Sequence, residues 1–369
     1  MKRKKILLVV GARPNFMKLA PLYFEFKKKK HFQPVILHTG QHYDFAMSEA
    51  FFKDLNLPKP DYFLGVKAAS QIEQIAKICT AFEKVLLKER PDLVVVFGDV
   101  NSTFACGFVA KRLFFPLAHV EAGLRSFDET MPEEINRKLT DSLAEILFST
   151  CPDDNRQLVR EGVKKERIHL VGDIMIDSLV KILNCIDRKK EWNLLNRYSL
   201  KQGSYALVTL HRPFNVDAIR RLAEIMGKLK QISRHLKIIF PVHPRTRKNL
   251  QALRFAESER ILLINPVNYS DFIILEKSAR FVLSDSGGIQ AETTHLGIPC
   301  LTLRPNTERP ITISHGTNQL VDLGNLKRKV DAILKNKRIK KKPIPYWDGK
   351  TAVRIVRFLE QWFKANDRK

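Results

Sequence analysis

The stretch ILLVVGARPNFMKLAP, residues 6–21, joins five consecutive apolar residues to a glycine turn and the start of a helix. An uninterrupted apolar run is typical of a parallel strand that is buried on both faces of its sheet. Similar runs recur along the chain and alternate with segments long enough for crossover helices. We expect strands at Ile6–Val10, Val35–His38, Leu93–Phe97, Leu117–Val120, Leu147–Ser149, His169–Val171, Ala206–Leu210, Ile238–Val242, Leu262–Ile264, Phe281–Leu283 and Cys300–Leu303. This alternation predicts an α/β fold with doubly wound parallel sheets.

The strand series is interrupted between residues 178 and 203, and this gap divides the chain into two predicted domains. A length of 369 residues also favours two domains. We expect a first Rossmann-like domain over residues 1–177 and a second over residues 178–345. Helices are expected at Ala69–Lys88, Ile219–Ile232 and Thr351–Phe363. The last of these, within residues 350–366, is expected to return to the first domain.

The formal net charge of +25 is unusual, with 64 lysine and arginine residues against 39 acidic ones. Strongly basic chains often bind nucleic acid or anionic membranes. Here the charge gathers in lysine-rich runs at the amino terminus, after a helix and in a late linker, which indicates a solvated surface. None of these runs is interleaved with the aromatic residues on which single-stranded nucleic acid stacks. We therefore predict no specific nucleic-acid partner.

The five cysteines are widely spaced and form no CxxC pair, which argues against a disulfide framework and against a zinc site. The apolar run near the amino terminus has five residues, whereas the apolar core of a signal peptide needs about 7–15. No segment reaches the roughly 18 apolar residues of a membrane span. We expect a soluble, cytoplasmic protein without membrane insertion, and the sequence contains no metal-binding constellation.

A glycine turn follows the first expected strand and leads into a helix. Gly11 opens this turn, and Arg13 and Lys18 add positive charge. Free backbone N–H groups and the positive end of the helix dipole favour an anion at such a position. The pattern is not the GxGxxG fingerprint, so a nicotinamide cofactor is not implied. A capped turn with two surface cations is the alternative interpretation.

A second glycine turn follows the strand Phe281–Leu283. Ser286 can cap the next helix, and Gly287 and Gly288 allow a phosphate to approach the backbone closely. Glu292, one turn into that helix, could accept hydrogen bonds from paired ribose hydroxyls. One anion site in each domain suggests a nucleoside diphosphate that bridges a cleft, although an ordinary helix start would also explain the glycines.

Several acids follow two strands of the first domain. Asp99 and Glu121 each follow an apolar run, and they share one edge of the sheet if the two strands are neighbours. Glu133 and Glu134 lie at the start of a helix after a proline. Carboxylates beside a cleft can tune one another's pKa and divide acid and base roles. Favourable interaction with the helix dipole would explain one of the last two acids without catalysis.

Histidine and arginine side chains follow strands of the second domain. His211 and Arg212 follow one strand, and His243 follows the next. Such groups can neutralise a departing diphosphate and donate to it. The segment from Arg304 to Pro310, which includes Arg309, is a polar loop that could close over a ligand or form an ordinary surface turn.

The polar strings occur in the order GARPNFMKLAP, HTGQH, GDVNST, HVEAGLRS, PEEINR, LHR, HPRT, SDSGGIQAE and RPNTERP. Together they resemble the motifs of the non-hydrolysing UDP-N-acetylglucosamine 2-epimerase family, over about residues 5–325. The resemblance implies a glycosyltransferase-B-like fold, with the site in the cleft between two Rossmann-like domains. It also implies a UDP-sugar substrate, a homodimer, and neither metal nor redox cofactor.

In the family chemistry, the proton at carbon 2 is removed as UDP leaves, which gives an enzyme-bound 2-acetamidoglucal. UDP then adds back, and a proton is delivered to the opposite face of carbon 2. By resemblance, the catalytic candidates are Asp99, Glu121, Glu133 and His211. The candidates for substrate binding are Arg13, Lys18, Arg137, Arg212, His243, Ser286, Gly287, Gly288, Glu292 and Arg309. The candidates for a regulatory substrate site are Gln41 and His42.

The sequence departs from the family pattern at three positions. Phe214 occupies the glutamate position of HRxEN, Ala291 replaces the first glutamate of SGGxQEE, and Asp44 stands near the regulatory motif where relatives carry glutamine. The main expectation is interconversion of UDP-N-acetylglucosamine and UDP-N-acetylmannosamine. The alternatives are a 2-epimerase for a UDP-2,3-diacetamido-hexuronate, a hydrolysing epimerase, a glycosyltransferase and a non-catalytic sensor. The set of acids argues against the last two.

Overall fold

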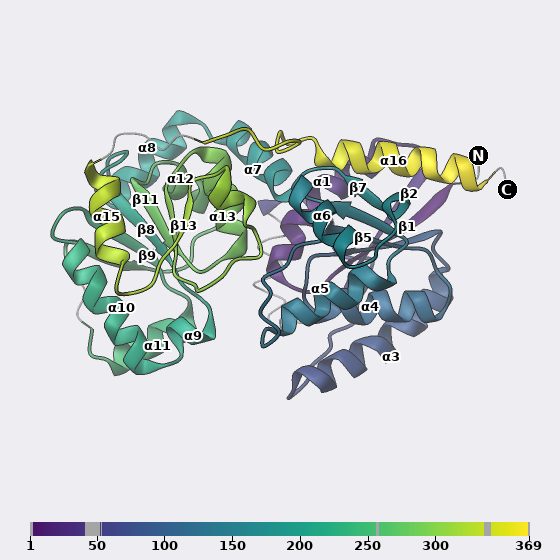
Figure 1. Ribbon diagram of the computed structural model, residues 1–369, viewed down its shortest axis with the longest axis horizontal. Coiled ribbons are helices and arrows are strands. Elements are labelled where there is room, and N and C mark those ends of the chain that lie inside the picture. Colours follow the sequence, from purple (N-terminus) through teal and green to yellow (C-terminus); the bar gives the residue numbers. More distant parts are fainter. Residues whose placement is uncertain (1–2, 41–51, 53, 256–257, 336–340, 368–369) are drawn as a thin grey trace. The chain divides into compact units, whose positions relative to one another are not determined.

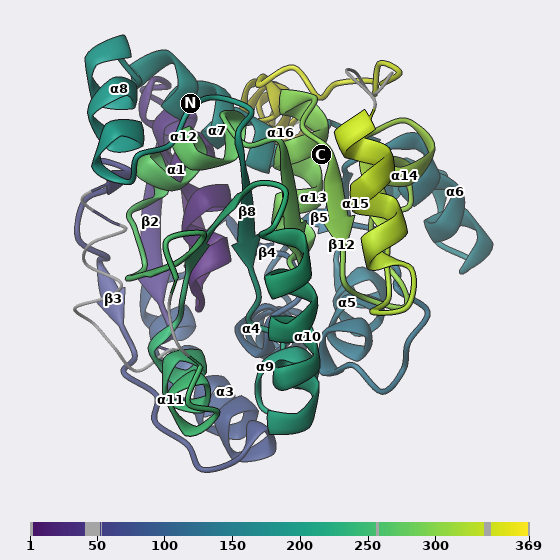
Figure 2. The same ribbon diagram turned by 90° about the vertical axis from the view of Figure 1, so that its left-hand side faces the viewer.

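The computed structural model describes residues 3–40, 52, 54–255, 258–335 and 341–367 of the chain. Two compact units are present: unit 1 comprises Met1–Val180 with Ile344–Lys369, and unit 2 comprises Lys181–Pro343. Figure 1 and Figure 2 show that each unit has a sheet flanked by helices.

Unit 1 is built on a seven-stranded sheet with the order β3-β2-β1-β4-β5-β6-β7. Its strands are β1 Lys4–Val10, β2 Phe32–His38, β3 Tyr62–Phe63, β4 Leu93–Phe97, β5 Leu117–Ala122, β6 Ile146–Ser149 and β7 Ile168–Leu170. All the strand pairings are parallel. The direction of winding changes between β1 and β4, and ligands of such folds bind at the carboxyl ends of the strands beside this point.

Helices cover both faces of the unit 1 sheet (Figure 1). Their bounds are α1 Arg13–Lys27, α3 Gln71–Glu89, α4 Asn101–Arg112, α5 Pro132–Leu143, α6 Pro152–Arg160, α7 Ile174–Cys185 and α16 Thr351–Asn366. The helices α3 and α4 pack on the face that carries Val9 and Val94. The C-terminal helix α16 packs against α1. Asp177 of α7 accepts hydrogen bonds from the first two backbone N–H groups of α16, at 3.0 and 2.8 Å, and so holds the start of that helix in unit 1.

Unit 2 is built on a six-stranded parallel sheet with the order β10-β9-β8-β11-β12-β13. Its strands are β8 Tyr205–Thr209, β9 Lys237–Pro241, β10 Ile261–Ile264, β11 Phe281–Ser284, β12 Cys300–Thr302 and β13 Asn318–Leu320. The winding changes between β8 and β11, which places the turns after these two strands at the expected ligand position.

The unit 2 sheet is also covered on both faces. Its helices are α8 Arg188–Arg197, α9 Pro213–Val216, α10 Ile219–Ile232, α11 Pro244–Ala252, α12 Tyr269–Lys277, α13 Gly287–Leu296, α14 Ile311–Ser314 and α15 Leu326–Lys335. Ala206 and Val208 of β8 face the core beneath α10 and α15, whereas Tyr205 and Leu207 face the core beneath α8 and α12. Burial on both faces explains why these strands are uninterrupted apolar runs.

The prediction of doubly wound parallel sheets is confirmed, and each predicted strand is present with a shift of at most a few residues at its ends. Two further strands were not predicted. These are β3 and β13, which have two and three residues and lie at sheet edges. Neither shows as an apolar run in the sequence, because β3 has two residues and β13 begins with two polar ones.

Candidate active site

The turn after β1 is held by a buried asparagine. Oδ1 of Asn15 accepts hydrogen bonds from the backbone N–H groups of Gly11 and Ala12, at 3.1 and 3.0 Å. Its Nδ2 donates to the carbonyl oxygen of Phe97 at 3.0 Å, which ties this turn to the end of β4. Asn15 carries no charge, and only its place in the turn could have pointed to this role.

Lys18 and Glu121 form an ion pair beside this turn. Lys18 lies on α1 and Glu121 near the end of β5, and their side chains are 8% and 4% exposed. The lysine predicted to bind phosphate therefore contacts one of the predicted acids. A Cβ placed on Gly98 would lie 2.6 Å from Nζ of Lys18 and 3.0 Å from Oε2 of Glu121. The absence of a side chain at Gly98 thus makes room for the pair next to Asp99.

The backbone of Glu121 has an unusual conformation. Its φ is +81°, in the region that favours glycine, and the register between β5 and β6 shifts between Val120 and Ala122. Such irregularities re-aim side chains at strand ends and occur frequently next to active sites. A non-glycine residue in this region costs of order 1–3 kcal/mol and persists only where the surroundings enforce it. This strain was not predictable from the residue type.

Arg137 connects two acids at the start of α5. Its guanidinium is almost completely buried and forms ion pairs with Asp99 and with Glu134, the latter at 2.7 Å. Asp99 is partly exposed, so its carboxylate remains accessible beside the buried arginine. Asn136 donates to the backbone carbonyl of Asp99 at 2.9 Å, which adds a second link between α5 and the end of β4.

The two adjacent glutamates at the start of α5 have different surroundings. Glu134 is fully buried and accepts hydrogen bonds from the backbone N–H groups of Ser126 and Phe127, at 2.9 and 3.0 Å. Burial alone would raise the pKa of Glu134, but these bonds and Arg137 outweigh burial, so its pKa is lowered. Glu133 is half-buried in the first turn of the helix. The surroundings of Glu134 are therefore those of a structural residue, and Glu133 is the more accessible of the two acids.

A histidine–aspartate pair lies at the winding change of unit 2. Nδ1 of His211 is 2.9 Å from Oδ1 of the buried Asp285, and the imidazole is half exposed. Asp285 also accepts from the backbone N–H of Arg212 at 3.0 Å and from Asn215 at 3.1 Å. Burial alone would raise the pKa of Asp285, but the contact with His211 and these bonds lower it. Asp285, which orients His211, was not among the predicted residues.

The start of α13 differs in one respect from the prediction. Ser286 occupies the position before the helix, but its side chain makes no capping hydrogen bond, so the prediction that it caps α13 is wrong. Its backbone N–H instead donates to the side chain of Ser284 at 3.0 Å. A Cβ on Gly287 would overlap Oε1 of Glu308, which shows that the carboxylate of Glu308 approaches the first residue of this helix.

Glu292 is buried in α13 and accepts a hydrogen bond from the hydroxyl of Tyr269, at 2.6 Å. The remaining predicted residues lie at the same strand ends: Arg13 begins α1, Arg212 precedes α9, His243 follows β9 and is exposed, Gly288 is the second residue of α13, and Arg309 is buried in the loop before α14. The candidates Gln41 and His42 lie outside the described residues, as does Asp44.

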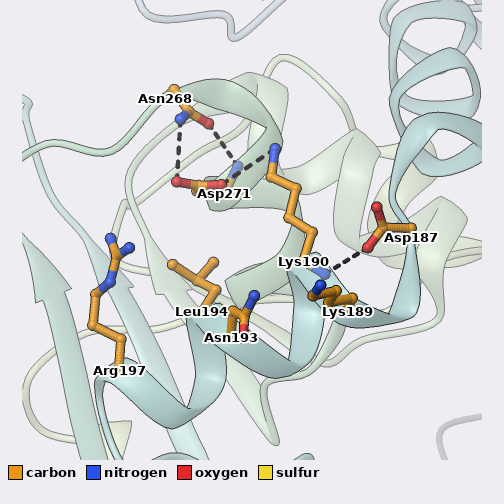
Figure 3. A pocket seen from close by; sticks show the side chains of 8 residues that line it. All are labelled: Asp187, Lys189, Lys190, Asn193, Leu194, Arg197, Asn268 and Asp271. Atoms are coloured by element: carbon orange, nitrogen blue, oxygen red, sulfur yellow. Dashed lines mark hydrogen bonds and ion pairs between the residues drawn. The ribbon is translucent and has the colours of Figure 1, made fainter.

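A hollow of about 390 Å³ lies between α8 and α12 and contains none of the predicted residues (Figure 3). Its lining residues are Asp187, Lys189, Lys190, Asn193, Leu194, Arg197, Asn268 and Asp271. The side chains of Asp187 and Asn268 cap the two helices, at 2.5 and 2.8 Å. The helix N–H groups are thus partly satisfied, and this hollow contributes nothing to the candidate site.

Within the described ranges, no group of three or more histidine, cysteine, aspartate or glutamate side chains could hold a metal ion. The same part of the chain contains no helix with the length and apolarity that crossing a bilayer requires. All five cysteines are free thiols.

A family model described as UDP-N-acetylglucosamine 2-epimerase matches residues 25–360. The chain belongs to this family. The predicted resemblance is thereby confirmed, as is the prediction that the chain is an isomerase of this family.

Relatives of this 2-epimerase family cover nearly the whole chain. A "UDP-N-acetylglucosamine 2-epimerase homolog" from Methanococcus maripaludis is 44% identical over 361 residues, which are 96% of this chain and 99% of the relative. A UDP-2,3-diacetamido-2,3-dideoxy-D-glucuronate 2-epimerase from Pseudomonas aeruginosa is 39% identical over 86% of this chain and 88% of its own. The crystal structure of the Methanocaldococcus jannaschii UDP-GlcNAc 2-epimerase in complex with UDP-GlcNAc and UDP has a TM-score of 0.88 at 41% identity, covering 97% of this chain and 99% of that one. This likeness confirms the predicted glycosyltransferase-B-like fold class.

Proposed function

We propose that the chain interconverts UDP-N-acetylglucosamine and UDP-N-acetylmannosamine. The observation that carries this proposal is the group of acids at the winding change of unit 1. Glu121 is paired with Lys18, and Asp99 is paired with Arg137. The family membership and the M. jannaschii structure with UDP-GlcNAc and UDP support the choice of substrate.

The proposed reaction needs a base and an acid at carbon 2 and a stable leaving group at carbon 1. One carboxylate among Asp99, Glu121 and Glu133 takes the proton from carbon 2. The electron pair of that C–H bond forms the C1–C2 double bond as the bond from carbon 1 to UDP breaks. In the second half of the reaction, UDP adds back to carbon 1 and an acid delivers a proton to the opposite face of carbon 2. The chain's own residues supply every proton transfer in this scheme.

Unit 2 is proposed to hold UDP. His211, oriented by Asp285, is half exposed and can donate to the departing diphosphate. The glycines at the start of α13 leave backbone N–H groups close to a phosphate position. Glu292 can accept hydrogen bonds from ribose hydroxyls. Arg13, Arg212, His243 and Arg309 are proposed as further contacts to the nucleotide sugar.

A second candidate substrate is the UDP-2,3-diacetamido-hexuronate. The P. aeruginosa relative that acts on such a sugar by name is 39% identical to this chain. Phe214, which replaces the family glutamate, is 66% exposed three residues after His211 and would change the surroundings of the sugar. The alternatives separate in one assay, in which the purified chain is incubated with each UDP-sugar and the products are resolved by chromatography. Conversion of UDP-N-acetylglucosamine supports the proposal, and conversion of the uronate alone contradicts it. Free UDP and N-acetylmannosamine in equal amounts would identify a hydrolysing enzyme.

We also propose a homodimer that acts in the cytoplasm. Exposed apolar side chains lie on three neighbouring helices of unit 1: Ile72 and Leu87 on α3, Phe108 on α4, Ile135 and Leu139 on α5. Exposed apolar side chains on adjoining helices are candidates for a protein interface, which contiguous apolar surface marks. Sedimentation should give twice the chain mass of 42.6 kDa for the parent, and Phe108→Glu should lower it. A monomeric parent would contradict the proposal.

A further inference from the structure

His119 lies in β5, two residues before Glu121, and its ring is completely buried. Its Nε2 is 2.8 Å from the carbonyl oxygen of Gly98, and its Nδ1 is 2.7 Å from Oδ1 of Asp141 on α5. A carbonyl oxygen can only accept a hydrogen bond, so Nε2 donates to Gly98. The ring therefore ties the end of β4 to α5.

Asp141 extends this set of contacts to the other side of Glu121. Its Oδ2 accepts from the backbone N–H of Gly123 at 3.1 Å and pairs with Arg125 at 2.8 Å. Burial alone would raise the pKa of Asp141, but His119 and Arg125 outweigh burial and lower it. Asp141 is therefore an ionised acceptor, and it lies against Nδ1 of His119.

The two turns held in this way are those that carry two of the predicted acids. Gly98 has φ +65° and directly precedes Asp99, and Gly123 has φ +88° two residues after Glu121. Glu121 itself has φ +81°, a conformation that persists only when its surroundings enforce it. The bond of His119 holds the backbone just before Asp99, and the bond of Asp141 holds the backbone just after Glu121.

We propose that His119 is a positioning residue for the proton transfer of Asp99, a role that rests on the proposed function. Its bond to Gly98 fixes the direction in which Asp99 leaves the sheet. Asp141, which the ring contacts, holds the turn that follows Glu121 through its own bonds with Gly123 and Arg125, and substitution of His119 removes neither of these. Because the ring is buried, it acts through the backbone at Gly98 and does not contact the sugar.

A purely structural role would stabilise the sheet without setting the rate, and two amide variants separate the roles. The NH₂ group of asparagine takes the place of Nδ1, whereas that of glutamine takes the place of Nε2. His119→Asn therefore keeps the contact with Asp141 and loses the donor to Gly98. His119→Gln keeps the donor to Gly98, so it serves as the matched control.

The test measures kcat and KM for UDP-N-acetylglucosamine, the Kd of UDP and the melting temperature for the parent and both variants. We expect His119→Asn to lower kcat about 100-fold, the effect of a displacement of about 1 Å. KM and the Kd of UDP should stay within about threefold, because the nucleotide groups of unit 2 are unchanged. His119→Gln should retain at least about ten times the kcat of His119→Asn.

Equal losses of kcat in the two variants, or a kcat of His119→Asn within about threefold of the parent, would overturn the role of His119. If His119→Asn fails to fold, the kcat of His119→Gln is compared with that of the parent instead. A kcat within about tenfold of the parent supports the proposal, and a larger loss overturns it. A parent that does not convert the substrate would overturn the proposed function itself, and this outcome is visible in the same assay.

Discussion

Replacing Lys18 by methionine tests the buried ion pair at the centre of the candidate site. The side chains of Lys18 and Glu121 are 8% and 4% exposed, so water screens the pair poorly. Methionine has a similar length and fills the space of the lysine stem without its charge. The substitution leaves the carboxylate of Glu121 buried without the ammonium that it contacts.

The expected loss of stability follows from this burial. Removing one partner of a buried ion pair costs about 3–5 kcal/mol, because the remaining charge stays in a poorly solvated position. For a unit of this size, each kcal/mol lowers the melting temperature by about 2–4 °C, which gives a decrease of about 6–20 °C. The double variant Lys18→Met/Glu121→Gln removes both charges and should lose less than the sum of the two single variants.

Urea unfolding and thermal melting of the parent and the three variants provide the measurement. Lys138→Met is a control in the same unit, because Lys138 and Glu129 form an ion pair with side chains 39% and 79% exposed. The control should cost less than about 1 kcal/mol. A loss for Lys18→Met as small as that of the control, or strict additivity in the double variant, would show that the buried pair does not stabilise unit 1.

Three further substitutions test other groups in the two units. Arg137→Lys replaces a guanidinium that pairs with both Asp99 and Glu134 by a single ammonium. We expect kcat to fall about 10–100-fold, and an unchanged kcat would contradict a role of this pairing in catalysis. Glu276 is fully buried, its carboxyl oxygens have no hydrogen-bond partner among the described residues, and burial raises its pKa well above 4.5. The stability that the protonated Glu276 contributes is therefore lost as pH rises through the raised pKa. In urea unfolding, the free energy of unfolding of Glu276→Gln should equal that of the parent at about pH 4 and exceed it increasingly toward about pH 8. A difference between the two proteins that does not change with pH would contradict a raised pKa of Glu276. Gly287→Ala would drive a Cβ into Glu308 and should weaken UDP binding about tenfold by calorimetry, and unchanged affinity would argue against phosphate at the start of α13.

The central strands could be predicted because burial on both faces leaves a local signature in the sequence. The runs Leu93–Phe97 and Phe281–Leu283 are apolar at each position, and both are strands in the structure. The segment Ile219–Ile232 was predicted as a helix and forms α10 with the same bounds. The strands β3 and β13 carry no such signature because β3 has two residues and β13 begins with two polar ones.

The site was predictable where charged residues follow a strand, and unpredictable where a role depends on a distant partner. Asp285 acquires its role from His211, 74 residues earlier in the chain. Asn15 acts on the carbonyl of Phe97, 82 residues later. The positive φ of Glu121 has no sequence signal either, because glutamate is not a residue that favours it. Such roles arise only when the sheet brings its strand ends together.

The most direct test of the proposed chemistry is proton NMR of UDP-N-acetylglucosamine incubated with the purified chain in deuterated water. We expect the manno epimer to form and to carry deuterium at carbon 2, because an acid of the site returns a solvent-derived proton to the opposite face. Formation of the epimer with the original hydrogen still at carbon 2 would contradict removal of that proton by Asp99, Glu121 or Glu133, and so would the absence of both conversion and exchange while UDP binds.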